Sequence, residues 1–264
     1  MAEKNIGFLG FGNMAQAMAQ GFLQKDTPAC GEIRACAKRW EKLQASTERL
    51  GAIPCRDSLE VLEQSDILIL AVKPYLIEEV LAPIKDKLEG KVLLSVAAGW
   101  PFSRFEEILP PGVHHLSIMP NTPVAIGEGV VLLEEEHSLS QEEHTYITEL
   151  LASLGTVETV AAAQMDIAGT LSGCGPAYAA MFLEALGDAG VLHGLPRELS
   201  YRLAAQMLAG TGKLHLATGQ HPGAMKDAVC SPGGTTIKGV AQLERRGFRG
   251  TVTDAITAVL QPKG

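Results

Sequence analysis

Apolar and polar residues alternate in blocks along residues 1–161, a pattern typical of strands separated by helices. One amphipathic block, 13–25, carries Met14, Met18 and Phe22 at helical spacing and predicts a helix with one apolar face. Most of the short runs are apolar at every position, as expected for strands that helices cover on both faces of a parallel sheet. The predicted strands are 5–10, 32–36, 67–72, 92–98, 114–120 and 129–134, with 156–160 as a candidate last strand.

The pattern changes after residue 161, where helical periodicity replaces the short apolar runs. The segment 175–192 is apolar nearly all round, and 196–219, 235–247 and 251–261 are further predicted helices. A helix that is apolar on all sides must be buried, and a domain of about 100 residues can bury little of it internally, so we expect a subunit interface. The chain is therefore predicted to be α/β, with a doubly wound Rossmann-type domain over 1–161 and an all-helical domain over 162–264.

Composition and charge exclude several classes of protein. The 264 residues carry a net charge of −8, which argues against nucleic acid or an anionic membrane as a partner, since both require clustered Lys and Arg. No apolar run approaches the ~20 residues of a membrane helix, and the N-terminus lacks a signal-peptide layout, so we expect a cytoplasmic protein. The five cysteines include no C-x-x-C pair and the seven histidines are scattered, so we expect neither a disulfide framework nor a metal site.

A glycine fingerprint stands at the first strand-to-helix turn. Gly10, Gly12 and Ala15 form G-x-G-x-x-A in GFLGFGNMA, between a predicted strand and a predicted helix. In this context Gly10 permits a tight turn, Gly12 lets backbone approach a pyrophosphate, and the helix N-terminus presents free N–H groups to the phosphates. A glycine turn without a ligand is the alternative.

The end of the second predicted strand bears on cofactor choice. NAD sites usually have an acidic residue there for the ribose 2′-hydroxyl, whereas this chain has Lys38 and Arg39. Both are suited to a 2′-phosphate, so we predict NADP(H), with NAD(H) as the alternative. The other interpretation is that the pair only solvates the start of a helix.

Three loops follow predicted strands at the edge where an open parallel sheet binds its ligand. They are AVKP (71–74), SVAAG (95–99) and MPNTP (119–123). Small residues or prolines give each of them a restricted shape, and together they favour a cofactor wall. Each loop on its own could simply be a well-formed connection.

SPGGTT (231–236) interrupts the helical region with a proline and two glycines. Gly233 and Gly234 can direct successive N–H groups into an anion-binding concavity, and Thr235 and Thr236 then open a helix whose first N–H groups are unpaired. The segment can therefore receive a small carboxylate. A plain helix–helix turn is the alternative from the sequence logic alone.

These motifs together resemble the pyrroline-5-carboxylate reductase family. GFLGFGNMA, AVKP, SVAAG, MPNTP, LSGCGPAY (171–178) and DAVCSPGGTTIKGVAQLE (227–244) occur in the family's order and spacing across nearly the whole chain. The last motif is specific to the family, whereas the first is shared by many dehydrogenases. The resemblance implies a Rossmann domain, a helical domain that forms homodimers and often decamers, and NAD(P)H-dependent reduction of 1-pyrroline-5-carboxylate to L-proline.

The resemblance also implies roles for particular residues. Thr236 matches the threonine proposed as proton donor, although a Thr hydroxyl is a poor acid and we interpret it mainly as a hydrogen-bonding and relay group. The substrate contacts would be Val229, Ser231, Gly233, Gly234, Thr235 and Thr236. The cofactor contacts would be Gly10, Gly12, Asn13, Met14, Lys38, Arg39, Ser58, Ala71, Val72, Lys73, Pro74, Ala97 and Asn121. The chain departs from relatives at Ala162, Ala163, Cys174 and Ala228, which affects substrate-edge contacts more than the reaction class.

Other functions remain as alternatives at this point. A reductase of a related cyclic imine would use the same motifs, and a β-hydroxyacid dehydrogenase would need a catalytic lysine that 171–184 does not contain. A non-catalytic NADP sensor would keep the glycine fingerprint but would have no need of SPGGTT.

Overall fold

The computed structural model describes residues 3–24 and 30–261, and the chain divides into two compact units, Met1–Gly173 and Cys174–Gly264. The predicted boundary at 161 differs from this division, because the segment 162–173 includes helix α7 (Met165–Gly169), which packs on strand β7 (Gly129–Glu134) of the first unit. The domain boundary at 161 stays a prediction. Residues 25 and 262–264, which end predicted segments, lie outside the described residues.

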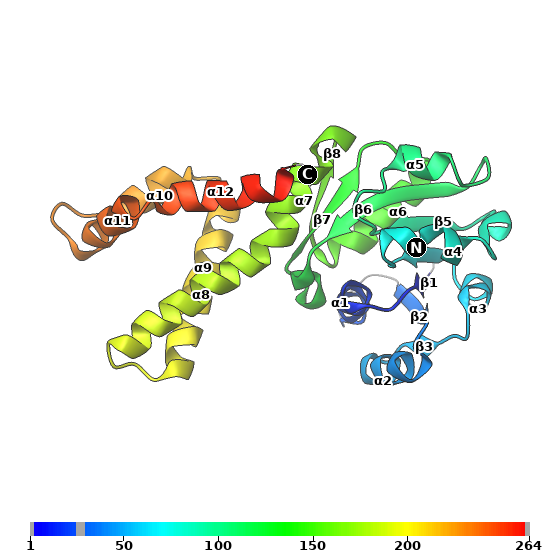
Figure 1. Ribbon diagram of the computed structural model, residues 1–264, viewed down its shortest axis with the longest axis horizontal. Coiled ribbons are helices and arrows are strands. Elements are labelled where there is room, and N and C mark those ends of the chain that lie inside the picture. The colour runs from blue at the N-terminus through cyan, green and yellow to red at the C-terminus, as the bar shows by residue number, and fades with distance from the viewer. Residues whose placement is uncertain (1–2, 25–29, 262–264) are drawn as a thin grey trace. The chain divides into compact units, whose positions relative to one another are not determined.

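The first unit contains an eight-stranded sheet in the order β3-β2-β1-β4-β5-β6-β7-β8 (Figure 1). The strand order reverses at β1: β2 and β3 lie on one side of it, and the chain then returns to add β4 on the other side, as in doubly wound folds. The predicted strands are all present, and the two-residue β3 is the one that the sequence pattern did not identify. The remaining bounds are β1 (Lys4–Leu9), β2 (Cys30–Cys36), β3 (Ile53–Pro54), β4 (Ile67–Leu70), β5 (Val92–Ser95), β6 (His114–Pro120) and β8 (Gly155–Val160).

Strand β7 runs antiparallel to β6, whereas all the other neighbouring strands are parallel. The connection between them holds only a 3-10 helix, Thr122–Ile126, which ends at Gly127 in the left-handed conformation. A parallel return needs a crossover of a dozen or more residues, so a link this short forces the reversal. The alternation of strands and helices therefore predicted the sheet but not this change of direction.

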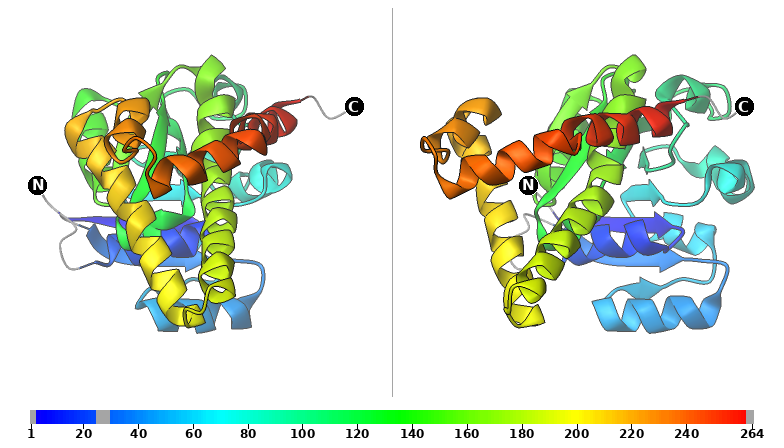
Figure 2. Two further views of the ribbon diagram at one scale, coloured as in Figure 1. Left: turned by 90° about the vertical axis from the view of Figure 1, so that its left-hand side faces the viewer. Right: turned by 60° about the vertical axis from the view of Figure 1, so that its left-hand side comes forward.

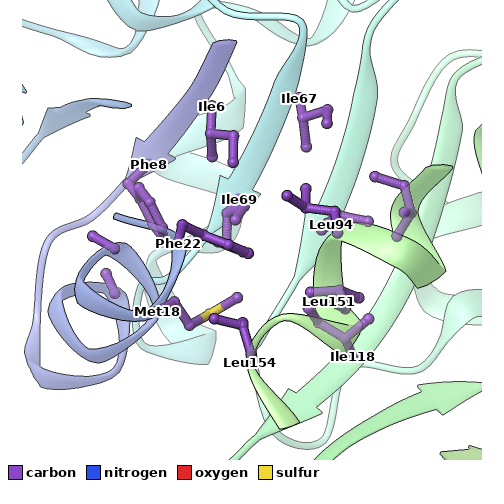
Figure 3. Close-up of a cluster of buried hydrophobic side chains, with 14 of the residues drawn as sticks. Ile6, Phe8, Met18, Phe22, Ile67, Ile69, Leu94, Ile118, Leu151 and Leu154 are labelled. Atoms are coloured by element: carbon purple, nitrogen blue, oxygen red, sulfur yellow. The ribbon is translucent and has the colours of Figure 1, made fainter. Parts of the chain in front are cut away.

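Helices cover both faces of the sheet. Side chains of α1 (Asn13–Phe22) and α6 (Gln141–Ala152) pack against one face, where Phe8, Phe22 and Leu151 are almost fully buried (Figure 3). The other face is covered by α3 (Ser58–Glu63), α4 (Ile77–Leu81) and α5 (Phe102–Glu106). The strands are apolar on both faces because helices cover both faces of the sheet. The edge formed by the carboxyl ends of the parallel strands is therefore the part of the sheet left accessible to a ligand.

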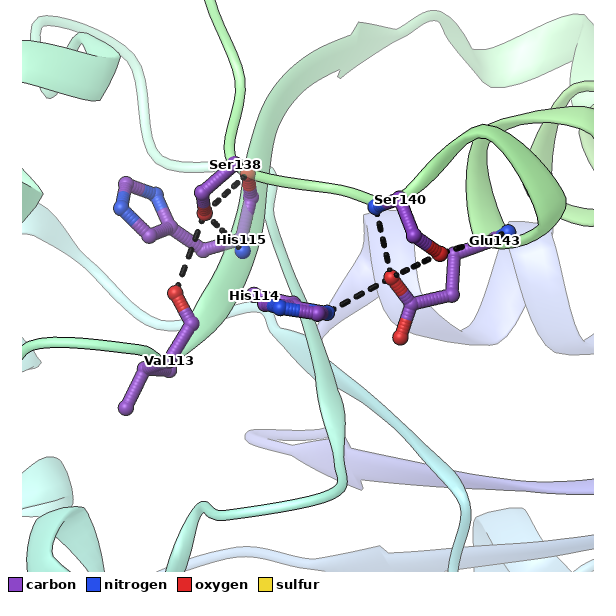
Figure 4. Close-up of polar contacts among 6 residues, drawn as sticks. All are labelled: Val113, His114, His115, Ser138, Ser140 and Glu143. Atoms are coloured by element: carbon purple, nitrogen blue, oxygen red, sulfur yellow. Dashed lines mark hydrogen bonds and ion pairs between the residues drawn. The ribbon is translucent and has the colours of Figure 1, made fainter.

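Two histidines at the start of β6 contact helices at the amino ends of the parallel strands, and Figure 4 shows the contact of His114 with Glu143 of α6. His114 Nδ1 lies 2.6 Å from the Glu143 carboxylate, which also accepts a hydrogen bond from Ser140 N at the start of α6. His115 is 1% exposed, and its Nε2 lies 2.7 Å from Glu106 Oε1 in α5. Because these contacts lie at the amino ends of the parallel strands, away from the ligand edge, they have a structural role.

The second unit is entirely helical over its described residues (Figure 2). Helices α8 (Gly175–Leu192) and α9 (Arg197–Thr218) pair as a hairpin, and Gly187 permits this because a Cβ there would lie 2.2 Å from the Tyr201 ring. The helices α10 (Pro222–Ala228), α11 (Thr235–Arg245) and α12 (Phe248–Leu260) follow along the chain. In the first unit, a further helix, α2 (Trp40–Leu50), connects β2 to β3. Met181 and Leu192 of α8 are 69% and 80% exposed. One copy of the unit therefore leaves much of its apolar surface uncovered.

Candidate cofactor and substrate sites

The turn after β1 has the geometry of a dinucleotide site. Gly10 adopts φ +92°, in the left-handed region, and its amide donates to Cys36 O at 3.0 Å. A Cβ on Gly10 would lie 2.6 Å from both Ala71 O and Val72 Cγ1, so only glycine allows this turn to approach the loop after β4.

Gly12 and Asn13 leave the start of α1 open. Gly12 is the N-cap residue of this ten-residue helix, no side chain caps the helix, and a Cβ on Gly12 would have no atom within 4 Å. Asn13 is exposed, and Met14 is partly exposed. The first N–H groups of α1 are therefore available to an anion such as a pyrophosphate, and the residues present fit one.

The adenosine side of the predicted site forms a cavity of about 440 Å³ at the carboxyl ends of β1, β2 and β3. The lining includes Lys38 and Ser58, which were predicted on the adenosine side. Gly10 and Val72, which were predicted at the phosphates and at the nicotinamide half, line the same cavity. Contact of these residues with a cofactor stays a prediction. Lys38 and Arg39 are exposed, have no ion-pair partner among the described residues, and line a second hollow beside Gly12. Arg56 and Asp57 also line the larger cavity and were not identified from the sequence.

The loop after β4 forms the wall next to Gly10. Ala71 N donates to Leu9 O at 2.8 Å, which continues the β1–β4 pairing by one residue. Lys73 is extended and exposed, and Pro74 begins a 3-10 helix, Pro74–Leu76. The strand itself ends at Leu70, and Pro74 opens the turn that follows. Cofactor contacts of Lys73 and Pro74 stay a prediction.

Ala97 and Asn121 lie apart from the adenosine cavity. Ala97 lines a separate cavity of about 250 Å³ with Trp100, Ser117 and Glu134. Asn121 is buried: its Nδ2 donates to Ser172 O at 3.0 Å, and its Oδ1 accepts from Val130 N at 2.8 Å. Both polar atoms of the Asn121 side chain thus brace the fold, and its contact with a cofactor stays a prediction.

Glu134, at the end of β7, is a buried acid that the sequence reasoning missed. The residue is 1% exposed, and its Oε2 accepts from Phe102 N, at the first turn of α5, at 2.7 Å. Its Oε1 is buried with no hydrogen-bond partner among the described residues. Burial raises the pKa of this carboxyl above its ordinary value, because the charged form loses hydration. The sequence signal was an acid that closes an otherwise apolar strand.

The raised pKa of Glu134 makes the stability of the protein depend on pH. The folded state holds the proton to a higher pH than the unfolded state does, so the free energy of unfolding is expected to fall as pH rises through the interval between the two pKa values. In Glu134→Gln this pH-dependent contribution to the free energy of unfolding is absent. The free energy of unfolding of the variant is therefore expected to rise relative to that of the wild type as pH increases. Urea unfolding from pH 4.5 to 8 at fixed protomer concentration measures it. A difference independent of pH would contradict the burial argument.

SPGGTT forms the connection between α10 and α11 in the second unit. Gly233 adopts φ +70°, whereas Gly234 is the extended N-cap residue of α11, and no side chain caps that helix. Gly234 N donates to Ser231 O at 3.0 Å, which closes a tight turn. The sequence predicted that the N–H groups of Gly233 and Gly234 could both be directed at an anion. In the structure the Gly234 N–H is instead used by the turn.

The remaining groups of this connection still suit a carboxylate. Thr235 and Thr236 are exposed and open the eleven-residue helix α11, whose first-turn N–H groups have no intrahelical partner. Val229, the C-cap residue of α10, is 64% exposed at the other end of the connection between α10 and α11. The predicted substrate residues thus gather in the helical unit, and the predicted cofactor residues gather in the sheet unit.

Comparison with known proteins gives matches over the whole chain. The family described as "Pyrroline-5-carboxylate reductase dimerisation" matches residues 162–263, and the one described as "NADP oxidoreductase coenzyme F420-dependent" matches 5–99. Pyrroline-5-carboxylate reductase of Treponema pallidum is 43% identical over 97% of this chain and 98% of its own length, and that of Escherichia coli is 35% identical over 98% and 97%.

Solved structures agree with these matches. The Plasmodium falciparum pyrroline carboxylate reductase with NADP bound has a TM-score of 0.86 and 31% identity, over 98% of this chain and 96% of that one. The Streptococcus pyogenes 1-pyrroline-5-carboxylate reductase has a TM-score of 0.85 and 32% identity, over 97% and 96%. The likeness therefore includes both the glycine turn and the SPGGTT connection.

Proposed function

Because the chain belongs to the pyrroline-5-carboxylate reductase family, we propose that it reduces the C=N bond of 1-pyrroline-5-carboxylate with NAD(P)H, giving L-proline as the last step of proline biosynthesis. The observation that carries the proposal is the match over nearly full length, which covers both the cofactor turn and the connection predicted to bind the substrate.

The sheet unit binds the cofactor. The open turn at Gly10 and Gly12 and the uncapped start of α1 would hold the pyrophosphate, and the loop 71–74 would lie along the nicotinamide half. When bound, the reduced nicotinamide supplies the hydride. The contribution of the protein is then orientation and charge stabilisation, for which no metal is needed.

The helical unit would hold the substrate. N–H groups at the start of α11 would bind the carboxylate, which fixes the position of the five-membered ring. The Thr236 hydroxyl would hydrogen-bond the ring nitrogen and relay a proton to it. This assignment gives Thr236 a role in the reaction and gives Val229, Ser231, Gly233, Gly234 and Thr235 roles in binding.

We expect the enzyme to use NADPH in preference to NADH. Lys38 and Arg39 are exposed cations without ion-pair partners among the described residues, at the position where a 2′-phosphate would lie. The KM for NADPH is expected to be about 10-fold or more below that for NADH, since a charge-assisted hydrogen bond contributes roughly 1.5–3 kcal/mol. A lower KM for NADH would contradict the assignment.

Substrate choice is tested by an NADPH-oxidation assay across five- and six-membered cyclic imino acids. The proposal predicts the highest kcat/KM with 1-pyrroline-5-carboxylate, and a higher value for a six-membered ring would favour a related cyclic imine as the substrate. A β-hydroxyacid dehydrogenase remains disfavoured, because α7 and α8 contain no lysine. Proline-dependent reduction of NADP+ at high pH distinguishes the enzyme from a non-catalytic NADP sensor.

The C-terminal helices carry the oligomeric contacts. The exposed apolar side chains of α8 and α9 support a homodimer through these helices, and a decamer is the larger assembly that we propose. No helix in the described part of the chain is long and apolar enough to cross a membrane. We place the enzyme in the cytoplasm.

A further inference from the structure

We propose that Arg56, stacked on Trp40, binds the 2′-phosphate of NADP(H) together with Lys38 and is a further determinant of the preference for NADPH over NADH. The guanidinium carbon of Arg56 lies 4.1 Å from the centroid of the Trp40 ring. The inference rests on the proposed function and assigns cofactor discrimination to a residue outside the Lys38–Arg39 pair.

The topology explains why two residues so far apart in sequence meet. Trp40 is the first residue of α2, directly after β2, and Arg56 follows β3. Strands β2 and β3 are parallel neighbours, with Ala35 opposite Pro54, so the segments after them leave the sheet at the same edge. Arg56, the second residue after β3, is thereby brought beside Trp40, which follows Lys38 and Arg39.

Trp40 gives the guanidinium a fixed platform. The Trp40 side chain is partly buried against the apolar cluster of the sheet, and this packing restricts the position of its ring. Stacking uses the flat face of Arg56 and leaves its N–H groups free at the rim, in the planar arrangement that binds phosphate by two hydrogen bonds. An arginine held in this way loses less side-chain entropy when an anion binds.

No acid among the described residues pairs with the Arg56 side chain. The carboxylate of Glu60 accepts from the backbone N of Arg56 at 2.6 Å, and not from its guanidinium. Asp57 Oδ1 accepts from Leu59 N at 3.0 Å and from Glu60 N at 2.9 Å, which commits that oxygen to capping α3. The positive charge of Arg56 is thus available to a ligand.

The same cavity joins Arg56 to the predicted adenosine contacts. Arg56, Lys38 and Ser58 line it together with Gly10, at whose turn the pyrophosphate would lie. A 2′-phosphate would then be held from two loops, with Lys38 on one side and the stacked guanidinium of Arg56 on the other. Asp57 lines the cavity too. Its carboxylate could accept a hydrogen bond from the 2′-hydroxyl of an unphosphorylated ribose, which would favour NAD(H) over NADP(H).

Calorimetric titration of the full-length protein with 2′,5′-ADP and with 5′-ADP tests the proposal without turnover. Wild type is expected to bind 2′,5′-ADP more tightly. In Arg56→Ala the Kd for 2′,5′-ADP is expected to rise about 10- to 100-fold while that for 5′-ADP stays within about two-fold. Arg56→Lys, which keeps the charge without the planar fork, and Trp40→Leu, which removes the platform, are expected to be intermediate.

Arg104→Ala is the matched control. The guanidinium of Arg104 stacks on Trp100 at 3.9 Å, a similar arrangement that has no part in the adenosine cavity. Its two Kd values are expected to equal those of wild type. Unchanged 2′,5′-ADP binding in Arg56→Ala, with the preference of the wild type intact, overturns this proposal alone. If wild type itself prefers 5′-ADP, and Asp57→Asn weakens that binding, the NADPH assignment fails as well.

Discussion

Replacing Thr236 with valine is expected to lower kcat about 100-fold while leaving the KM for NADPH unchanged. Thr236 is exposed in the first turn of α11, and its assigned hydrogen bond to the ring nitrogen strengthens as that nitrogen gains electron density. Removing one such donor typically costs about 10²- to 10³-fold in kcat. Valine keeps the shape of threonine, so the loss reports on the hydroxyl and not on packing. Steady-state kinetics with both substrates varied measure it.

Thr236→Ser is the matched variant for this prediction. It restores the hydroxyl, and we expect it to recover most of the lost kcat. A second control is Thr253→Val, since the Thr253 hydroxyl donates to Arg249 O within α12 and has no assigned role in the site. Full turnover by Thr236→Val would remove the catalytic role of the residue.

Replacing Gly10 with alanine is expected to raise the Kd for NADPH about 100-fold or more and to lower Tm. The new Cβ would lie 2.6 Å from Ala71 O, and φ +92° is a conformation that alanine rarely adopts. The turn must therefore shift away from the loop after β4, and each hydrogen bond to a charged phosphate that this shift breaks costs roughly 1.5–3 kcal/mol, or about 10- to 100-fold in Kd. NADPH fluorescence titration and thermal unfolding measure the two effects.

Gly12→Ala separates the two effects that Gly10→Ala combines. A Cβ on Gly12 would have no protein atom within 4 Å, so Tm is expected to stay at the wild-type value. The methyl group would project toward the predicted pyrophosphate, so cofactor affinity is still expected to fall. Wild-type affinity and Tm in Gly10→Ala would contradict the structural account of the turn.

The fold was predictable where local pattern and topology agree. Apolar runs identified the strands, and the segment 175–192, apolar nearly all round, indicated a helix that needs a partner copy to cover it. The two-residue β3 has too short a pattern to recognise, and the antiparallel β7 depends on the length of its connection rather than on its own sequence. Periodicity reports the faces of an element but not its direction in the sheet.

The candidate site was predictable only in part. Gly10, Lys38 and Ser58 were expected in one site and line one cavity, because motif position fixes which edge of the sheet they share. Arg56 was missed because its place beside Trp40 depends on the pairing of β2 with β3, which no local pattern reveals. Glu134 had a local signal, an acid at the end of an apolar strand, but its burial depends on the segments that pack around it. The Gly234 amide was expected to be free, and the turn it closes with Ser231 depends on backbone angles that the letters alone do not specify.

A crystal structure of the protein with L-proline and NADP+ bound would test the central claim most directly. The account predicts that the carboxylate of proline lies on the N–H groups at the start of α11, within the connection 231–236, with the Thr236 hydroxyl at hydrogen-bond distance from the ring nitrogen. Proline bound away from this connection, with its carboxylate held by other groups, would contradict the account.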